Sequence, residues 1–332
     1  MIRQISIFDE QELPPELRAQ RVLNKSRIPE IAHYIRDNPH DYVFSAITAS
    51  IDSEVEFEPI SPTEKRLGML KVPMEAKFII NDGQHRRAAI LAALEEKPEL
   101  AYETIAVVFF LDIGLERCQQ MFADLNRHAI RPSRSLGLLY DHRNERAKLA
   151  RLVIMKSSVF RDMVDMEKSS LALRSRKLFT LSAFFNACAD LIDGLAIGDR
   201  EKDASLARDY WEAVAQHFPV WINVRDGKIP ASDVREGFIH SHGIALQALG
   251  KAGNSLIKAF PSTWKRKLSS LADIDWSRSN AKLWEGRALI GGRVSKVTTN
   301  IILTINVIKK QLGLELEAEE QKVEAAFLRR DA

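Results

Sequence analysis

The chain has 332 residues, 45% hydrophobic and 28% charged, a composition typical of soluble globular proteins that excludes a disordered chain. Because a single core stops growing near about 250–300 residues, this length predicts two parts. The start lacks the pattern of a secretory signal and no apolar run reaches the roughly 18 residues of a membrane span, so we expect a cytoplasmic protein with no membrane partner. The two cysteines, Cys118 and Cys188, have no zinc-ligand spacing, so we expect neither a disulfide nor a metal site.

The net charge is only +3, but the positive charge is concentrated in one segment. Between Arg127 and Lys177 there are 13 Lys or Arg residues against 5 Asp or Glu residues, a local net charge of +8. The rest of the chain therefore sums to −5, and an acidic tail contributes Glu315, Glu317, Glu319, Glu320 and Glu324. The distribution predicts a localised basic surface.

The first 130 residues have the pattern of a mixed α/β unit. Two short helices are expected within Glu12–Asn38, before the stop at Asn38-Pro39. Strands are expected at Tyr42–Ile47 and Val55–Phe57, with an acidic turn between them.

A strand, a tight turn and a helix are expected next. Lys77–Ile80 is the strand, Asn81-Asp82-Gly83 is the turn, and Arg87–Leu94 contains strong helix formers. The continuous apolar run Ile105–Leu111 predicts a central strand that is buried on both faces. A helix over Leu115–Asn126 closes the unit.

After Pro132 the pattern changes to long amphipathic helical segments. They are Leu136–Val153, Leu178–Ile192, Ser205–His217, Val234–Leu249 and Ser255–Leu271. A final apolar stretch, Ile301–Ile308, precedes the acidic tail. We therefore predict an α+β protein with a mixed α/β domain at residues 1–131 and a mainly α-helical domain at residues 132–332.

The turn between the strand and the helix is the candidate phosphate or nucleotide site. Its residues are Asp82, Gly83, Gln84, His85, Arg86 and Arg87. Backbone N–H groups and the positive end of the helix dipole meet at such a turn, and arginine forks suit phosphate or carboxylate. Asp82 has three open roles, namely orienting an arginine, capping the helix or holding a metal. In the simpler alternative, Asp82 caps the helix and the arginines are solvated.

Two further groups of residues extend the candidate sites. Asn126, at the end of the Leu115–Asn126 helix, faces the turn if the two helices flank one pocket; otherwise it is a left-handed helix cap. The candidate DNA contacts are Arg131, Arg134, Arg143, Arg146, Arg151, Arg174, Arg176 and Lys177. Several of these cations have helical spacing along one face, which matches a phosphate-tracking surface on double-stranded DNA; the alternative is a solvated helix face.

The decapeptide Asn-Asp-Gly-Gln-His-Arg-Arg-Ala-Ala-Ile at positions 81–90 resembles the signature of DGQHR-domain proteins. Within them the chain is similar to the DndB family over nearly its whole length. The supporting stretches are Arg27–Ile35, Tyr42–Ala46, Gln120–Asn126 and Arg235–His240. The DGQHR unit is in turn similar, more distantly, to the ParB N-terminal fold, whose equivalent turn contacts nucleotide phosphate.

The resemblance to the DndB family implies a cytoplasmic bacterial repressor of the DNA phosphorothioation (sulfur modification) gene cluster that binds promoter DNA, with other DNA sulfur modification proteins as partners. The ParB-like resemblance implies an alternative, in which a nucleoside triphosphate with Mg is bound or hydrolysed at Asp82–Arg87 and Asn126. The chain has no GxxxxGK[ST] loop, so an ordinary P-loop ATPase is excluded. No catalytic residue is assigned, and a palindromic operator would favour a homodimer.

Overall fold

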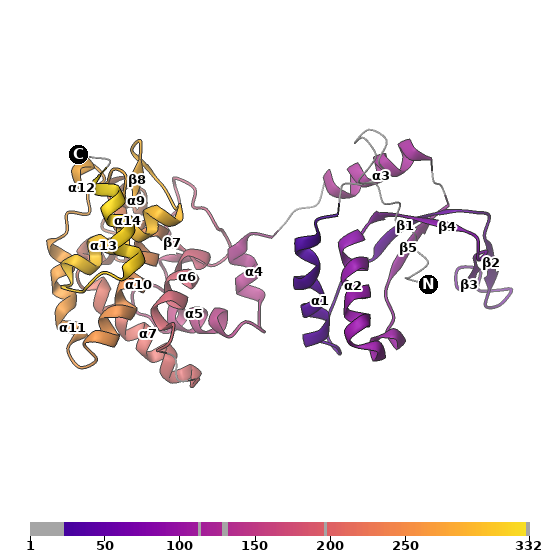
Figure 1. Cartoon of the computed structure of the whole chain (residues 1–332), viewed down its shortest axis with the longest axis horizontal. Helices are drawn as coiled ribbons and strands as arrows, with labels where there is room; N and C mark the ends of the chain where they lie inside the picture. The colour runs from indigo at the N-terminus through magenta and orange to yellow at the C-terminus, as the bar shows by residue number, and fades with distance from the viewer. Residues whose placement is uncertain (1–22, 112–113, 128–131, 196–197, 330–332) are drawn as a thin grey trace. The chain divides into compact units, whose positions relative to one another are not determined.

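The computed structural model describes residues 23–111, 114–127, 132–195 and 198–329 (Figure 1). The chain divides into two compact units, residues 1–130 and 131–332. Small sheets dominate the N-terminal unit and helices the C-terminal unit, so the predicted α+β class is confirmed. None of the helices in these ranges combines the length and the apolar character that crossing a bilayer requires.

The N-terminal unit is built on a three-stranded sheet with the order β4-β1-β5. Strand β1 pairs antiparallel with β4 and parallel with β5. The elements are η3 (Lys25–Arg27), α1 (Ile28–Asp37), β1 (Ile47–Asp52), β2 (Glu56–Pro59), β3 (Gly68–Lys71), β4 (Lys77–Asp82), α2 (Gln84–Glu96), η4 (Pro98–Tyr102), β5 (Val107–Phe110) and α3 (Leu115–Arg127).

Two small hydrophobic clusters hold this unit together. One lies on the sheet and contains Ile47, Ile51, Phe78 and Ile80. The other joins α1 to α2, which run side by side in Figure 1, and contains Ala32, Ile35, Ala89, Ala93 and Leu100. Because both clusters include residues of β4 or α2, the turn between these two elements is anchored on each side.

Two strand predictions in this unit are wrong. Residues 42–46 are not a strand, and β1 begins at Ile47, because Tyr42 and Phe44 pack against the α1–α2 cluster instead of pairing. Strand β5 is not central: among the residues that the structure describes it pairs only with β1, and Val108 is 46% exposed. The apolar run therefore covers both faces of a strand at the edge of the sheet. Of the two helices predicted in Glu12–Asn38, the second is confirmed as α1, and residues 12–22 lie outside the described residues.

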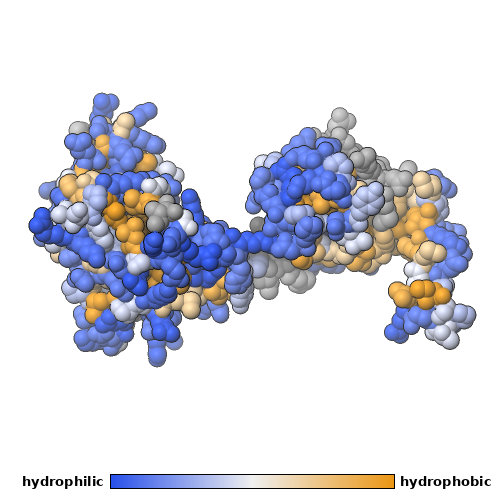
Figure 2. Space-filling view, turned by 90° about the horizontal axis from the view of Figure 1, so that it is seen from below, coloured by the Kyte–Doolittle hydropathy of each residue, from blue (hydrophilic) through white to orange (hydrophobic). Residues whose placement is uncertain are grey.

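The hairpin of β2 and β3 is separate from the main sheet. Both strands are exposed along their whole length. Figure 2 shows apolar side chains gathered on this hairpin, and the exposed ones include Ile60, Leu67 and Met69. The hairpin therefore adds little to the core, which lies on the sheet, between α1 and α2, and at Cys118 and Met121 of α3.

The C-terminal unit is a helical bundle with short two-stranded pairs. Its elements are α4 (Arg134–Tyr140), α5 (Glu145–Lys156), β6 (Val164–Asp165), β7 (Phe179–Thr180), α6 (Leu181–Ile192), α7 (Arg200–Ala215), α8 (Pro219–Arg225), α9 (Ala231–Gly237), η5 (Ile239–Ser241), α10 (Gly243–Ala259), α11 (Trp264–Lys267), η6 (Leu268–Asp273), α12 (Ala281–Trp284), β8 (Leu289–Ile290), β9 (Arg293–Val294), α13 (Thr298–Gln311) and α14 (Ala318–Leu328).

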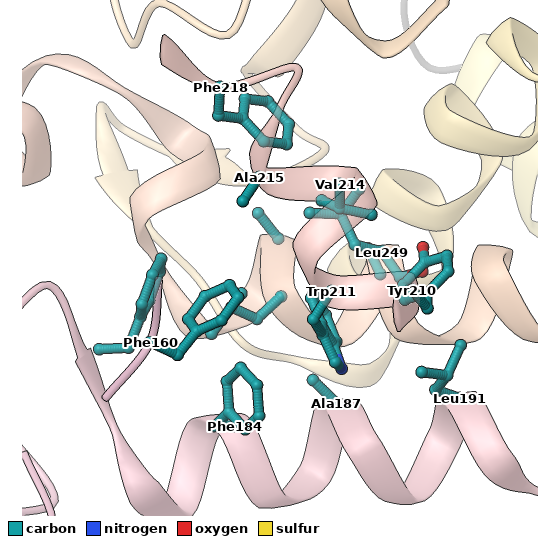
Figure 3. Packing of buried hydrophobic residues seen from close by; sticks show 14 of the residues in the cluster. Phe160, Phe184, Ala187, Leu191, Tyr210, Trp211, Val214, Ala215, Phe218 and Leu249 are labelled. Carbon is teal, nitrogen blue, oxygen red and sulfur yellow. The ribbon is translucent and has the colours of Figure 1, made fainter. Parts of the chain in front are cut away.

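Helices α6 and α10 form the centre of this unit. They approach closely at Gly250, where an added Cβ would overlap the carbonyl of Ala187. Aromatic side chains fill the space between α6 and α7, and Figure 3 shows Phe160, Phe184 and Trp211 packed together there. All three are fully buried, so one continuous core supports the bundle.

Three predictions about the helical part need correction. The helix predicted at Leu136–Val153 is two helices, because Asp141 accepts hydrogen bonds from the backbone of residues 143 and 144 and Asn144 caps α5. The helix predicted at Val234–Leu249 is broken into α9, η5 and α10. The helix predicted at Ser255–Leu271 is divided among the end of α10, α11 and η6. The acidic tail includes α14, which packs through buried ion pairs.

Candidate functional site

The turn between β4 and α2 has the predicted order of strand, turn and helix. Gly83 is the N-cap of α2 and has φ = +103°, a conformation that L side chains rarely adopt. The N-cap residue itself makes no side-chain capping hydrogen bond, and the hydrogen bond described for the Asp82 carboxylate is with Arg86. The backbone N–H groups of the first turn therefore face the space in front of the helix.

Replacing Gly83 with alanine is expected to destabilise this turn by about 1–3 kcal/mol, because the new side chain would be held in a strained backbone conformation. Its Cβ would also lie 3.1 Å from the Arg86 guanidinium and 3.2 Å from a carbon of Ile47. Hydrogen exchange of the β4 and α2 amides in the full chain measures the effect. Gly137→Ala is the control, since an added Cβ there meets nothing within 4 Å; equal protection in both variants would contradict the expectation.

Arg86 forms a clamp across the turn. Its guanidinium donates to Asp82 Oδ2 at 2.5 Å and to the Ser45 carbonyl at 2.5 Å, and it also contacts the Ser45 hydroxyl. The Arg86 side chain is only 14% exposed, whereas that of Asp82 is 41% exposed. Of the three roles left open for Asp82, the structure shows the orientation of an arginine. This pair also explains how the first turn of α2 tolerates a cation at its positive end.

The other residues of the turn differ in their environments. Gln84 and His85 are buried. His85 Nε2 accepts a hydrogen bond from the backbone N–H of Asn24 at 3.0 Å. Arg87 is half-buried, and burial lowers its pKa. The turn therefore combines fixed internal contacts with an open face.

That open face is a pocket of about 210 Å³. It is lined by Arg27, Ile31, Asn81, Asp82, Gly83, Gln84, His85, Arg86, Phe122 and Asn126. The pocket brings the predicted turn residues together with Asn126 from α3, and Arg87 is not in its lining. Asn126 Nδ2 donates to the Phe122 carbonyl at 2.8 Å, which holds its amide against α3.

Four lining residues were not among the predicted site residues. Arg27 and Ile31 come from the start of the stretch 27–35 that carries part of the family resemblance, and this was the signal available for them. Asn81 was taken as part of the turn without a role. Phe122 lies in the stretch 120–126 that also carries part of the resemblance, but an apolar residue on an amphipathic helix is ordinarily a core residue.

The predicted DNA contacts are distributed over several elements. Arg151 is buried and donates to the carbonyls of Leu138 and Asp141, closing the turn between α4 and α5. Arg146 lies 3.6 Å from Asp193 in an exposed ion pair. Arg143 lies in the loop before α5, so these cations do not form the stripe expected on a single helix.

The remaining predicted contacts lie nearer the start of α4 and in the loop before β7. Arg131 lies outside the described residues. Arg134 is exposed and donates to Asn186 Oδ1 at 2.8 Å. Arg174 and Arg176 are exposed, while Lys177 Nζ donates to the Asp162 carbonyl at 2.7 Å.

Arg235 organises the loop that carries Arg174 and Arg176. Its guanidinium donates to four loop carbonyls, those of Ala172, Leu173, Ser175 and Lys177. The Arg235 carbonyl is in turn bonded by His242 Nε2 at 2.8 Å, directly before α10. The loop is therefore tied to the start of a central helix.

Lys296 adds a cation at the same helix start. Its ammonium lies against Gly243, so that a methyl group on this glycine would overlap it. Although the residue as a whole is exposed, partial burial of its charged end and, secondly, the nearby charge of Arg134 lower the pKa of Lys296. Among the described contacts, no carboxylate pairs with Arg134, Arg174, Arg176 or Lys296. We call these four residues the basic surface.

Comparison with known proteins identifies the family. A family model described as DndB, DNA-sulfur modification-associated, matches residues 1–315. No curated protein and no solved structure matches the chain. The match covers both units and stops just before α14. The chain therefore belongs to the DndB family of proteins associated with DNA sulfur modification.

Proposed function

We propose that this protein is a DNA-binding regulator that represses the DNA sulfur modification gene cluster by contacting the promoter. The proposed contacts are made mainly by the helical part, residues 132–332. The N-terminal part, residues 1–131, is a ParB-like unit in this proposal and carries the turn pocket. Family membership supports the association with DNA sulfur modification. The positive charge of the basic surface supports the contact with DNA.

The observation that carries the proposal is the set of unpaired cations on the basic surface. An exposed arginine near a carboxylate is already compensated, as Arg146 is by Asp193. Arg134 and Lys296 instead repel each other, which raises the free energy of the protein until an anion lies between or beside them. A DNA backbone supplies such anions at regular spacing. A solvated surface without a bound anion would leave the repulsion between Arg134 and Lys296 uncompensated.

A second candidate function is nucleotide binding at the turn pocket, as in ParB-like proteins. The helix N-terminus and Arg27 favour an anion there. However, about 210 Å³ is smaller than the roughly 300–1,000 Å³ of ordinary small-molecule pockets. The described walls therefore suit one phosphate group better than a whole nucleoside triphosphate, and this ranks the nucleotide switch second.

Binding of a promoter fragment and of a shuffled fragment of equal length tests the proposal. A regulator is expected to prefer the promoter by at least about 10³-fold, which is the lower end of specificity for DNA-binding proteins. Adding each nucleoside triphosphate with Mg tests the second candidate in the same assay. Equal binding of the two fragments at low and at moderate salt would contradict the proposed regulator function. If the promoter fragment is palindromic, the number of protein chains bound to each fragment shows whether a homodimer binds.

A further inference from the structure

The basic loop before β7 carries one exposed leucine. Residues 168–177 contain no Asp or Glu and four cations, which are Lys168, Arg174, Arg176 and Lys177. In the middle of this loop, Leu173 is 64% exposed. Within residues 157–195, all of which the structure describes, Leu173 is the one large apolar residue that is exposed. The loop therefore presents a single apolar side chain to solvent among cations.

Leu173 lies at the tip of a tight turn. The backbone N–H of Ser175 donates to the Ala172 carbonyl at 2.9 Å, which makes Leu173 and Arg174 the two central residues of a β-turn. The Arg235 guanidinium donates to the carbonyl of Leu173 itself at 2.7 Å and to that of Ala172 at 3.0 Å. Ordering a solvated loop costs conformational entropy, and these hydrogen bonds offset that cost before any partner binds. The turn therefore presents Leu173 in a fixed position.

The turn is continuous with the basic surface. Arg174, the neighbour of Leu173 in the turn, is one of the four residues of that surface. The loop also contacts the first turn of α4, because Ser135 Oγ donates to the Lys168 carbonyl at 2.8 Å. Arg134, another residue of the basic surface, precedes Ser135 on the same helix. A phosphate held by Arg174 therefore brings a groove of the DNA to Leu173.

A lone apolar side chain between cations suits DNA better than a protein partner. A stable protein interface buries about 1,600 Å² in total around an apolar centre, and residues 157–195 offer Leu173 alone. Proteins that bend DNA from the minor groove insert single apolar side chains, including leucine, between base pairs. The arginines that flank Leu173 match the phosphates on both sides of such a groove in charge. The charge and the size of the exposed tip therefore favour DNA as its partner.

We propose that Leu173 is an apolar wedge that enters the minor groove of DNA and opens one base step, while Arg174 and Arg176 hold neighbouring phosphates. This inference rests on the proposed function and deepens it, because phosphate contacts alone carry no sequence information. Opening a base step costs least at the flexible pyrimidine–purine steps TA and CA/TG. The wedge therefore gives a preference for promoter DNA that has such a step at the contacted position.

The shape of bound DNA tests the wedge in the full chain. Energy transfer between dyes at the two ends of the promoter fragment measures its bend, and 2-aminopurine placed at its TA and CA/TG steps reports unstacking. Protein is added to saturation, so that weaker binding is not mistaken for straight DNA. With the wild type, a bend of about 20–90° and a rise in 2-aminopurine fluorescence are expected.

Three variants separate the wedge from general effects. Leu173→Ala is expected to leave the DNA nearly straight and to lower the preference for the promoter over a shuffled fragment about tenfold or more. Since Leu173 is exposed, this change leaves folding intact. Leu173→Met keeps an apolar side chain and is expected to keep the bend. Met155→Ala on α5 is the matched control, because Met155 is also 64% exposed in the same unit, and it is expected to behave as the wild type does.

The outcomes distinguish the wedge from the regulator itself. Straight, stacked promoter DNA in the wild-type complex overturns the wedge, and so does a bend that Leu173→Ala leaves unchanged. If the wild type still prefers the promoter in either case, the regulator stands without the wedge. Equal binding of the promoter and shuffled fragments, with a bend that depends on Leu173 in both, supports the wedge and overturns the regulator.

Discussion

Replacing Glu324 with alanine is expected to lower the free energy of unfolding of the helical unit by about 3–5 kcal/mol. The Glu324 side chain is 7% exposed and accepts hydrogen bonds from Arg287 at 2.8 and 2.9 Å and from Asn306 at 2.9 Å. The Arg287 side chain is only 11% exposed, so removal of its partner leaves a largely buried charge uncompensated. Lys310, which also contacts Glu324, is half exposed and loses less.

Chemical denaturation followed by tryptophan fluorescence measures this loss of stability, because the buried Trp284 belongs to the hydrophobic core of the helical unit. The control is Glu319→Ala on the same helix α14, where the side chain is exposed and a change within about 0.5 kcal/mol is expected. If both variants unfold at the same denaturant concentration as the wild type, the ion pairs do not hold α14 in place.

The same carboxylate gives the stability a defined pH dependence. Burial alone would raise the pKa of Glu324, but the hydrogen bonds from Arg287, Lys310 and Asn306 outweigh it and hold the pKa at about 2. Since the folded pKa is below the value of about 4.5 in an unfolded chain, the stabilisation is complete above that value. It is lost as the pH falls from about 4.5 toward about 2. The Glu324→Ala variant should therefore show a weaker acid dependence than the wild type.

Reversing the charge of both loop arginines, Arg174→Glu with Arg176→Glu, is expected to weaken promoter binding about tenfold or more at low salt. The two cations have no described carboxylate partner, and Arg235 holds their loop in place through four carbonyls. If each arginine contacts one phosphate, the slope of log affinity against log salt should fall by about 1.8, at about 0.9 for each contact. Fluorescence anisotropy at several salt concentrations gives both quantities.

The control for this double variant changes the same charge elsewhere on the helical unit. Lys282→Glu with Lys322→Glu alters two exposed lysines on α12 and α14. It is expected to leave the salt slope near that of the wild type. Because phosphate contacts carry no sequence information, the arginine variant should lose affinity for promoter and shuffled DNA alike. A loss equal to that of the control would show that net charge, and not this loop, sets the affinity.

The local pattern of the chain predicted the turn well, because strand and helix signals there are separated by a glycine. The positive φ of Gly83 and the order of β4 and α2 follow from residues that are adjacent in the sequence. The position of β5 could not be predicted in this way. An apolar run is typical of a central strand, but whether a second strand pairs with its free edge depends on distant parts of the chain.

The tertiary partners of the basic residues could not be predicted from the local sequence either. The count of cations between Arg127 and Lys177 gave no information about partners far away in the sequence, such as Asp193 for Arg146. That segment also ends well before Lys296, which reaches the start of α10 from a later part of the chain. Arg151 has helical spacing like its neighbours, yet it is buried because the chain turns at Asp141. Tertiary contacts therefore decide which cations form a basic surface, while the sequence shows only which cations are present.

The most direct measurement is binding of the wild type and of Arg86→Ala to the promoter fragment, at two salt concentrations and with and without each nucleoside triphosphate. We expect the wild type to prefer the promoter over shuffled DNA, with affinity that falls steeply with salt and does not change with nucleotide. Binding without sequence preference at either salt concentration would contradict the regulator. Promoter binding that a nucleotide switches, and that Arg86→Ala uncouples, would instead make the turn a nucleotide sensor.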